Sequence, residues 1–309
     1  LPTPGESGSL ANTKALVVDG IPASVVSASS ISDNGAYQIG DEIIITVQYN
    51  EVVTVTGVPQ LTLETGSNDG VASYSIGSGT NTLSFIYTIT VGHASSDLEY
   101  NSNTALALNS GIVQDLAGNN VNLTLPTVGE TGSLATNKAL VIDGVYATVD
   151  SISAITANGY YKAGDTLSIT IHFDEIVNVA GSPQLVLETG SNDATVYYTS
   201  GTGTSILTFQ YIAGEGHLNT DLGYVNTSSL SLNNGLIRDI AGNDATLTLA
   251  DPGASGSLSG NRALVVDAIS PSVVSVSSSE LNGMYNIGDT LEITVNFSEV
   301  VTTNISNGS

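Results

Sequence analysis

The chain has 309 residues, which suits two or three domains of ordinary size. It carries 29 Asp and Glu against 5 Lys and Arg, and the resulting formal net charge of −24 argues against nucleic acid or anionic lipid as a partner. The absence of cysteine excludes disulfides and thiol chemistry. The sequence also has no run of about 18 apolar residues, which a membrane-spanning helix would need.

A repeat of 124 residues runs through the sequence without a gap. Residues that return at this spacing include Gly40, Gly164 and Gly288; Tyr37, Tyr161 and Tyr285; and Asp19, Asp143 and Asp267. The segment LETGSND at 63–69 returns unchanged at 187–193. A repeat of this length predicts independent globular modules rather than a solenoid of short units.

The repeat also predicts where the modules begin and end. The expected divisions are 1–18, the closing strand of a preceding module; 19–142 and 143–266, two complete β-sandwiches; and 267–309, the opening strands of a third, incomplete module. On this prediction the chain is cut from a longer array. We expect neighbouring modules or other chains to hold its two end pieces.

Each repeat reads as a series of short β-strands. Apolar and polar residues alternate in the second strand of each repeat, at 41–49, 165–173 and 289–297. Further strand-like runs in the first repeat are 60–64, 71–76, 82–90, 105–108 and 123–125, separated by clusters of Gly, Asn, Asp, Ser and Pro. No stretch shows a helical period, so the predicted fold class is all-β, with tandem antiparallel β-sandwiches.

Two motifs in these repeats resemble those of bacterial immunoglobulin-like (Ig-like) domains. The first ends the second strand and reads VQYNE at 47–51, IHFDE at 171–175 and VNFSE at 295–299. The second reads DLAGN at 115–119 and DIAGN at 239–243. The resemblance implies an Ig-like sandwich of the kind found in large bacterial surface proteins, where such modules mostly act as spacers.

Oxygen-bearing side chains are expected to meet at one pole of each module. In an antiparallel sandwich the end of the second strand lies beside the start of the first, and the DxAGN turn should reach the same pole. The expected ligands are Asp19, Asn50, Glu51, Asp115 and Asn119; Asp143, Asp174, Glu175, Asp239 and Asn243; and Asp267 with Glu299. Converging hard oxygen ligands suit Ca²⁺. The alternative is that these residues only form turns, in which their side chains bind the local backbone.

Three of the five cations occupy one repeated position, at Lys14, Lys138 and Arg262. Each lies five residues before the Asp that begins the next module (Asp19, Asp143 or Asp267). A residue five positions along a strand lies on its other face, so direct pairing with that Asp is not expected. We predict instead an interaction with a neighbouring strand or chain.

The sequence favours a non-enzymatic function. No Ser-His-Asp set recurs, no nucleotide-binding fingerprint is present, and the repeats are equal copies. We expect an extracellular structural protein of a bacterial surface (a stalk, adhesin or filament subunit) whose partners are other copies or neighbouring modules, with calcium as its one candidate cofactor. Two alternatives stay open: a ligand- or glycan-binding adhesin module, and an accessory module of a secreted hydrolase.

Overall fold

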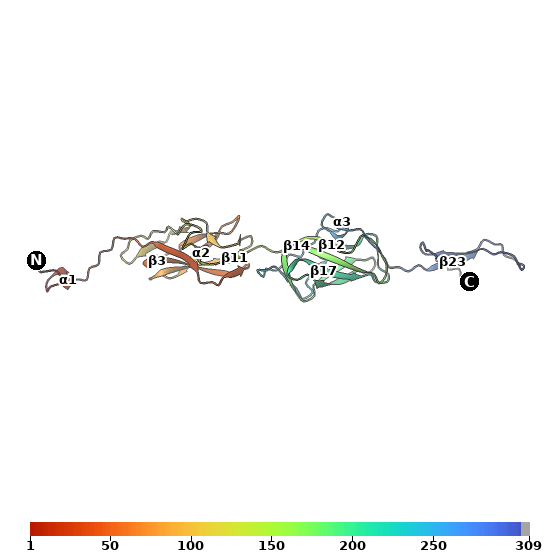
Figure 1. Cartoon of the computed structure of the whole chain (residues 1–309), viewed down its shortest axis with the longest axis horizontal. Coiled ribbons are helices and arrows are strands. Elements are labelled where there is room, and N and C mark those ends of the chain that lie inside the picture. Colours follow the sequence, from red (N-terminus) through yellow and green to blue (C-terminus); the bar gives the residue numbers. More distant parts are fainter. Residues whose placement is uncertain (304–309) are drawn as a thin grey trace. The chain divides into compact units, whose positions relative to one another are not determined.

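The computed structural model describes residues 1–303, so residues 304–309 of the predicted third module lie outside the described residues. The chain divides into two compact units (Figure 1). One comprises Leu1–Ala147 together with Arg238–Ala245, and the other comprises Thr148–Ile237 together with the residues from Thr246 onward.

The first unit contains a β-sandwich built from strands that are mostly short. Its elements are α1 (Leu10–Thr13), β1 (Val25–Ser30), β2 (Gly35–Tyr37), β3 (Glu42–Thr56), β4 (Gln60–Glu64), β5 (Gly70–Ile76), β6 (Thr80–Thr88), β7 (Ala94–Ser95), β8 (Glu99–Tyr100), β9 (Leu106–Ala107), β10 (Ile112–Asp115), α2 (Leu134–Asn137) and β11 (Leu140–Asp143).

Two sheets make up this sandwich. The larger has the strand order β1-β3-β6-β5-β4-β8, with β10 paired to β3 and β9 paired to β4, and every one of these pairs is antiparallel. The smaller sheet has the order β2-β11-β7, in which β11 runs parallel to β2 and antiparallel to β7. Strand β11 is the last strand of this sandwich along the chain, so its pairing with β2 closes the sandwich.

The second unit repeats this arrangement, and its elements lie 124 residues further along the chain. They are β12 (Val149–Ala154), β13 (Gly159–Tyr161), β14 (Thr166–Ala180), β15 (Gln184–Glu188), β16 (Ala194–Ser200), β17 (Thr204–Ile212), β18 (Leu218–Asn219), β19 (Gly223–Tyr224), β20 (Leu230–Ser231), β21 (Leu236–Arg238), α3 (Leu258–Asn261) and β22 (Leu264–Asp267), followed by β23 (Val273–Ser278) and β24 (Ile293–Phe297). The large sheet has the order β12-β14-β17-β16-β15-β19, and β23 and β24 form a separate two-stranded sheet.

The core of the first sandwich follows from the alternation of apolar residues along its strands. In β3, Ile43, Ile45 and Val47 are fully buried, while the residues between them are partly exposed. Leu134 and Leu140, from the segment that closes the sandwich, belong to the same buried cluster. The fold class predicted from the sequence, an all-β sandwich of mainly antiparallel strands, is therefore confirmed.

Two details differ from the sequence prediction. Residues 123–125 form no strand, although Leu125 is buried and its N–H donates to Asn103 O at 2.9 Å. Within residues 1–303 there are also three helices of four residues each, which follow Ser9, Ser133 and Ser257. A single turn is too short to show a helical period in the sequence. None of the described helices has the length and apolar character needed to span a membrane.

One glycine is required at the turn between β5 and β6. Gly77 has φ +116°, and a Cβ atom there would lie 2.2 Å from Thr82 O. Gly201 repeats this in the second unit, where a Cβ atom would lie 2.1 Å from Ile206 O. Both the backbone conformation and the close approach of the facing strand thus exclude any other residue.

Tyr49 leads to a testable prediction about stability. It is 1% exposed, its hydroxyl has no hydrogen-bond partner among the described residues, and the other repeats have Phe173 and Phe297 at this position. Leaving a buried hydroxyl unpaired costs about 1–3 kcal/mol. We expect Tyr49→Phe to raise the free energy of unfolding, measured by urea denaturation, by about 1 kcal/mol.

Tyr100→Phe is the matched control. Tyr100 is also buried, but its hydroxyl donates to Pro126 O at 2.5 Å. We expect this variant to lower the free energy of unfolding by about 1 kcal/mol. Equal losses in the two variants would show that the Tyr49 hydroxyl does have a partner.

Candidate metal centre

Glu51 lies in the second half of β3. The buried residues of this strand alternate from Ile43 to Tyr49 and resume at Val53, and Glu51 lies between these two buried stretches. Its side chain is half-buried. The pairing of β3 with β6 is irregular between Gln48 and Val53, and irregularities of this kind often redirect a side chain. A carboxylate thus stands at the end of an apolar row.

Asp115 ends β10 directly beside this part of β3, where it pairs with Val53. Its side chain is 3% exposed. Asp115 Oδ1 accepts hydrogen bonds from the backbone N–H groups of Ala117 and Asn119, both at 2.9 Å, and Oδ2 accepts one from Asn119 Nδ2 at 2.8 Å. Burial acts to raise the pKa of Asp115, but the hydrogen bonds from Asn119 and from the backbone of 117–119 outweigh it and hold the pKa below its ordinary value.

Asp19 reaches the same place from the segment that precedes β1. Its carboxylate is exposed, and Oδ1 accepts a hydrogen bond from Ile21 N at 3.0 Å. Its backbone oxygen accepts one from Asn119 Nδ2 at 3.2 Å. Residues 11–22 are exposed throughout, so Asn119 is a tie between this segment and the sandwich.

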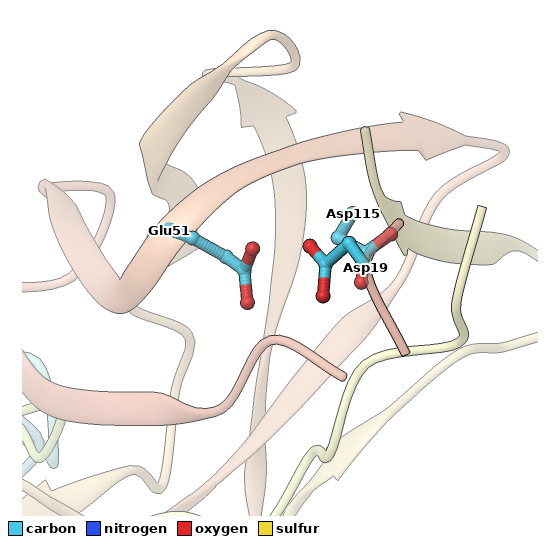
Figure 2. A group of neighbouring side chains, drawn as sticks. All are labelled: Asp19, Glu51 and Asp115. Carbon is cyan, nitrogen blue, oxygen red and sulfur yellow. The ribbon is translucent and has the colours of Figure 1, made fainter. Parts of the chain in front are cut away.

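The three carboxylates converge, as Figure 2 shows. One oxygen from each of Asp19, Glu51 and Asp115 lies within 4.8 Å of the others. Desolvation raises the pKa of Glu51, and the negative charges of Asp19 and Asp115 raise it further. The ion pair found within residues 1–303, between Arg238 and Asp244 at 2.6 Å, involves none of the three. The cluster therefore combines mutual repulsion with partial burial.

This set of ligands has the chemistry that Ca²⁺ prefers. Three carboxylates offer up to six oxygen atoms, and Ca²⁺ binds about six to eight oxygens at roughly 2.3–2.6 Å. Neither histidine nor cysteine belongs to the cluster, whereas zinc sites usually include them. The turn holds Asp115 in place, so turn formation and metal binding are compatible roles for the same residue.

Asn50 and Asp174 bind the residue just before the first strand of their own sandwich. Asn50 Oδ1 accepts a hydrogen bond from Ser24 N at 2.8 Å. Asp174 Oδ1 and Oδ2 accept from Thr148 N and Thr148 Oγ1, both at 2.7 Å. In both repeats this side chain ties the long strand to the residue just before the first strand, and neither Asn50 nor Asp174 belongs to a carboxylate cluster within residues 1–303.

The second repeat reproduces the geometry of the turn. Asn243 Nδ2 donates to Asp143 O at 3.0 Å and to Asp239 Oδ2 at 2.8 Å. Desolvation raises the pKa of Asp143, the hydrogen bond from Val145 N opposes this, and the charge of Asp239 adds to the increase. Glu175, the counterpart of Glu51, lies in β14 of the second unit.

The remaining predicted ligands, Asp267 and Glu299, belong to no group of three such residues within the described part of the chain. Asp267 Oδ1 accepts a hydrogen bond from Ile269 N at 3.3 Å, and Glu299 is half-buried.

Two of the three repeated cations bind the first strand of their own sandwich or the residues directly after it. Lys138 Nζ donates to Ser32 O at 2.8 Å, and Arg262 Nε donates to Ser153 Oγ at 3.1 Å. The third cation, Lys14, is exposed.

Sequence reasoning missed the buried carboxylate of Glu99. Its Oε1 accepts hydrogen bonds from Tyr100 N at 3.0 Å and Leu134 N at 3.1 Å, and its Oε2 accepts one from Ala135 N at 3.1 Å. Glu99 thus fixes the first turn of α2 against β8. The second repeat has Gly223 at this position, so comparison of the repeats gave no signal.

No protein-family model matches the chain, and no curated protein is significantly similar to it in sequence. The carboxylate cluster is therefore interpreted from its geometry, and the resemblance to bacterial Ig-like domains stays a prediction.

The raised pKa of Glu51 predicts how stability depends on pH without metal. The folded state binds this proton more tightly than the unfolded state, so the penalty for ionised Glu51 is present at pH 7 and disappears as pH falls through the raised pKa. In chelator, we expect Glu51→Gln to be more stable than the parent protein at pH 7. This difference in the free energy of unfolding should shrink between pH 7 and about pH 4.3, the ordinary pKa of a glutamate.

Glu42→Gln provides the control, because Glu42 is exposed at the start of the same strand and the charge change is identical. Its effect should stay nearly constant over this pH range. The opposite trend for Glu51→Gln, a stability advantage that grows as pH falls, would contradict the proposed repulsion.

Proposed function

We propose that this chain is a non-enzymatic structural protein of an extracellular bacterial surface, built from tandem Ig-like β-sandwich modules that act as rigid spacers. The equal copies of one sandwich support this proposal. So does the identity of segment 63–69 with 187–193, because a recognition loop would be expected to differ between copies. The module boundaries at 19, 143 and 267 belong to the same proposal.

Calcium is the proposed cofactor. The observation that carries this part is the convergence of Asp19, Glu51 and Asp115 within 4.8 Å. Asp19 comes from the exposed segment before β1, whereas Glu51 and Asp115 come from adjacent strands of the sandwich. An ion bound to all three would anchor that segment to the sandwich and would offset the repulsion among the carboxylates. Calcium would thus stiffen the entry to a module.

Thermal unfolding in 5 mM Ca²⁺ and in excess EGTA tests the proposed cofactor. Free calcium about 100-fold above its Kd adds roughly 2.7 kcal/mol of stability, so we expect a rise in Tm of several degrees. Glu51→Gln should reduce the rise without abolishing it, because Asp143 and Asp239 repeat two of the three carboxylates.

Glu42→Gln should leave the calcium response unchanged. An equal Tm in calcium and EGTA for the parent protein would overturn the metal site and would leave the acidic residues as turn-forming and solubilising groups. Magnesium at the same concentration serves to exclude a nonspecific effect of ionic strength.

A hollow of about 620 Å³ in the second unit favours ligand binding as a second candidate function. Its polar lining includes Arg262, His172, Asn261, Ser151, Thr170 and Thr208, without an acidic residue. The first repeat has Lys138 in place of Arg262 and Gln48 in place of His172. Guanidinium, imidazole and hydroxyl groups together suit an acidic sugar.

Binding of uronic-acid oligosaccharides, measured by calorimetry, tests this second candidate. We expect the double variant His172→Gln with Arg262→Lys, which restores the first-repeat residues, to lose the binding at an unchanged Tm. Failure of the parent protein to bind, or equal binding by the double variant, would rule the hollow out as an acidic-sugar site.

A further inference from the structure

An Asn–Gly pair recurs where the short strands β2 and β13 begin. It stands at 34–35 and at 158–159, and the sequence has the same pair at 282–283. The side chains of Asn34 and Asn158 are exposed. Asparagine is among the chemically labile residues, and a following glycine offers no side chain to hinder attack of its nitrogen on the carboxamide.

One residue just before β11 holds both reactive groups of the first pair. Gly35 N donates a hydrogen bond to Ala139 O at 3.1 Å, and Asn34 Oδ1 accepts one from Ala139 N at 3.2 Å. While these bonds last, the nitrogen of Gly35 and the carboxamide of Asn34 both face Ala139 and not each other. Strand pairing therefore protects a reactive sequence.

The second unit repeats this protection. Gly159 N donates to Ala263 O at 3.1 Å, and Asn158 Oδ1 accepts from Ala263 N at 3.2 Å. Packing does not require the glycine here, because a Cβ atom at residue 159 would come no closer than 3.9 Å, to Tyr161 Oη. The reactive pair is thus kept at a position that has room for a side chain.

The strands that protect the two pairs are easily opened. Strand β2 is an edge strand, pairs with β11 over three residues, and has no buried residue. Strand β13 pairs with β22 in the same way. Short exposed strands of this kind open locally at a fraction of the free energy of global unfolding. Each opening releases the glycine nitrogen and the carboxamide together.

We infer that Asn34 and Asn158 are modification sites, at which opening of the edge strand lets the Asn–Gly bond rearrange to isoaspartate, and that the rearranged strand no longer pairs. This inference goes beyond the proposed structural function and is independent of the metal site. It gives each sandwich a limited lifetime in its fully paired form.

The rearrangement needs only water. The nitrogen of Gly35 loses its proton to solvent and attacks Asn34 Cγ. The bond from Cγ to the amide nitrogen breaks, and this nitrogen takes a proton from water and leaves as ammonia. Water then opens the cyclic imide. Cleavage at the original peptide carbonyl leaves isoaspartate, whereas cleavage at Cγ leaves aspartate. Overall, water is consumed and ammonia is released, without oxidation or reduction.

The two products affect the strand differently. Isoaspartate lengthens the backbone by one carbon directly before Gly35, so the register of Gly35 with Leu140 is lost. Aspartate keeps the normal backbone, and its carboxylate can still accept the hydrogen bond from Ala139 N. The loss of pairing therefore belongs to the rearranged backbone and not to the added charge.

A third Asn–Gly pair, at 234–235, provides an internal reference. Gly235 is buried, its N–H donates to Leu232 O at 2.7 Å, and a Cβ atom there would lie 2.6 Å from Ala180 O. We expect incubation at mildly alkaline pH, followed by peptide mass spectrometry, to show at least about tenfold faster modification of Asn158 than of Asn234. Equal rates would overturn the role of the edge strand.

A disulfide across the strands tests whether opening is required. Ala36 and Val141 are paired, and adjacent strands lie about 4.8 Å apart, within the Cα separation of about 4.4–6.8 Å that a disulfide allows. In oxidised Ala36→Cys with Val141→Cys, modification of Asn34 should slow about tenfold and that of Asn158 should not change. Reduction should restore the rate. An unchanged rate at Asn34 in the oxidised protein would refute the inference.

Gly159→Ala is the converse variant. It should nearly abolish modification of Asn158 and leave that of Asn34 unchanged, because the added methyl group hinders attack by the nitrogen. Continued modification of Asn158 at the parent rate would exclude the imide route.

Hydrogen exchange tests the effect on pairing. The isoaspartate form at residue 34, separated chromatographically from aged Gly159→Ala protein, should exchange the amide protons of residues 35–37 at least about tenfold faster than fresh protein. Asn34→Asp has the same added charge on a normal backbone and should keep the slow exchange. Equal exchange in the isoaspartate form and in Asn34→Asp would show that the rearranged strand still pairs.

Discussion

The alternation of apolar residues along β3 is the constraint on which both the sandwich and the carboxylate cluster depend. The buried row Ile43, Ile45, Val47 and Tyr49 fixes which face of the strand is inward, and β1 and β6 pair on its two sides. Glu51 follows this row by two residues, where the pairing of β3 with β6 becomes irregular. On β10, Asp115 likewise follows the buried Val113 on one face. Burial of the apolar rows therefore brings the two acids together at the end of the core in spite of their repulsion.

The two acids meet different surroundings there, and this difference gives the cluster its chemistry. Asp115 receives hydrogen bonds from its own turn, so its pKa is lowered and it stays ionised. Burial and the charges of Asp19 and Asp115 raise the pKa of Glu51. A cation at this place would interact with the carboxylate of Asp115, which its hydrogen bonds already hold in position. It would also relieve the electrostatic repulsion that ionised Glu51 experiences. Turn formation and ion binding would thus reinforce each other.

The sequence predicted the parts of this structure that follow from local alternation. The run 60–64 matches β4. The strand predicted at 41–49 corresponds to β3, which begins at Glu42. Its extension to Thr56 was not predicted, because it depends on pairing with β10, some 60 residues away along the chain. The sequence also predicted that Asp19, Glu51 and Asp115 lie at one end of the sandwich. It did not predict that Asn50 Oδ1 accepts a hydrogen bond from Ser24 N, because this depends on the orientation of the Asn50 side chain. The role of Glu99 could not be predicted from the repeat, because the second repeat has Gly223 at the corresponding position.

The junction residue Asp143 links the closing of one repeat to the turn of the next. It ends β11, whose pairing with β2 and β7 completes the first sandwich, and its backbone oxygen accepts the hydrogen bond from Asn243. The negative charge of Asp239 acts to raise the pKa of its carboxylate. The position of this carboxylate is therefore set by the strand that closes the preceding repeat. Asp19 has the same contact with Asn119. An ion bound beside either contact would stabilise the strand end and the turn together, and would thereby couple the folding of one repeat to that of the next.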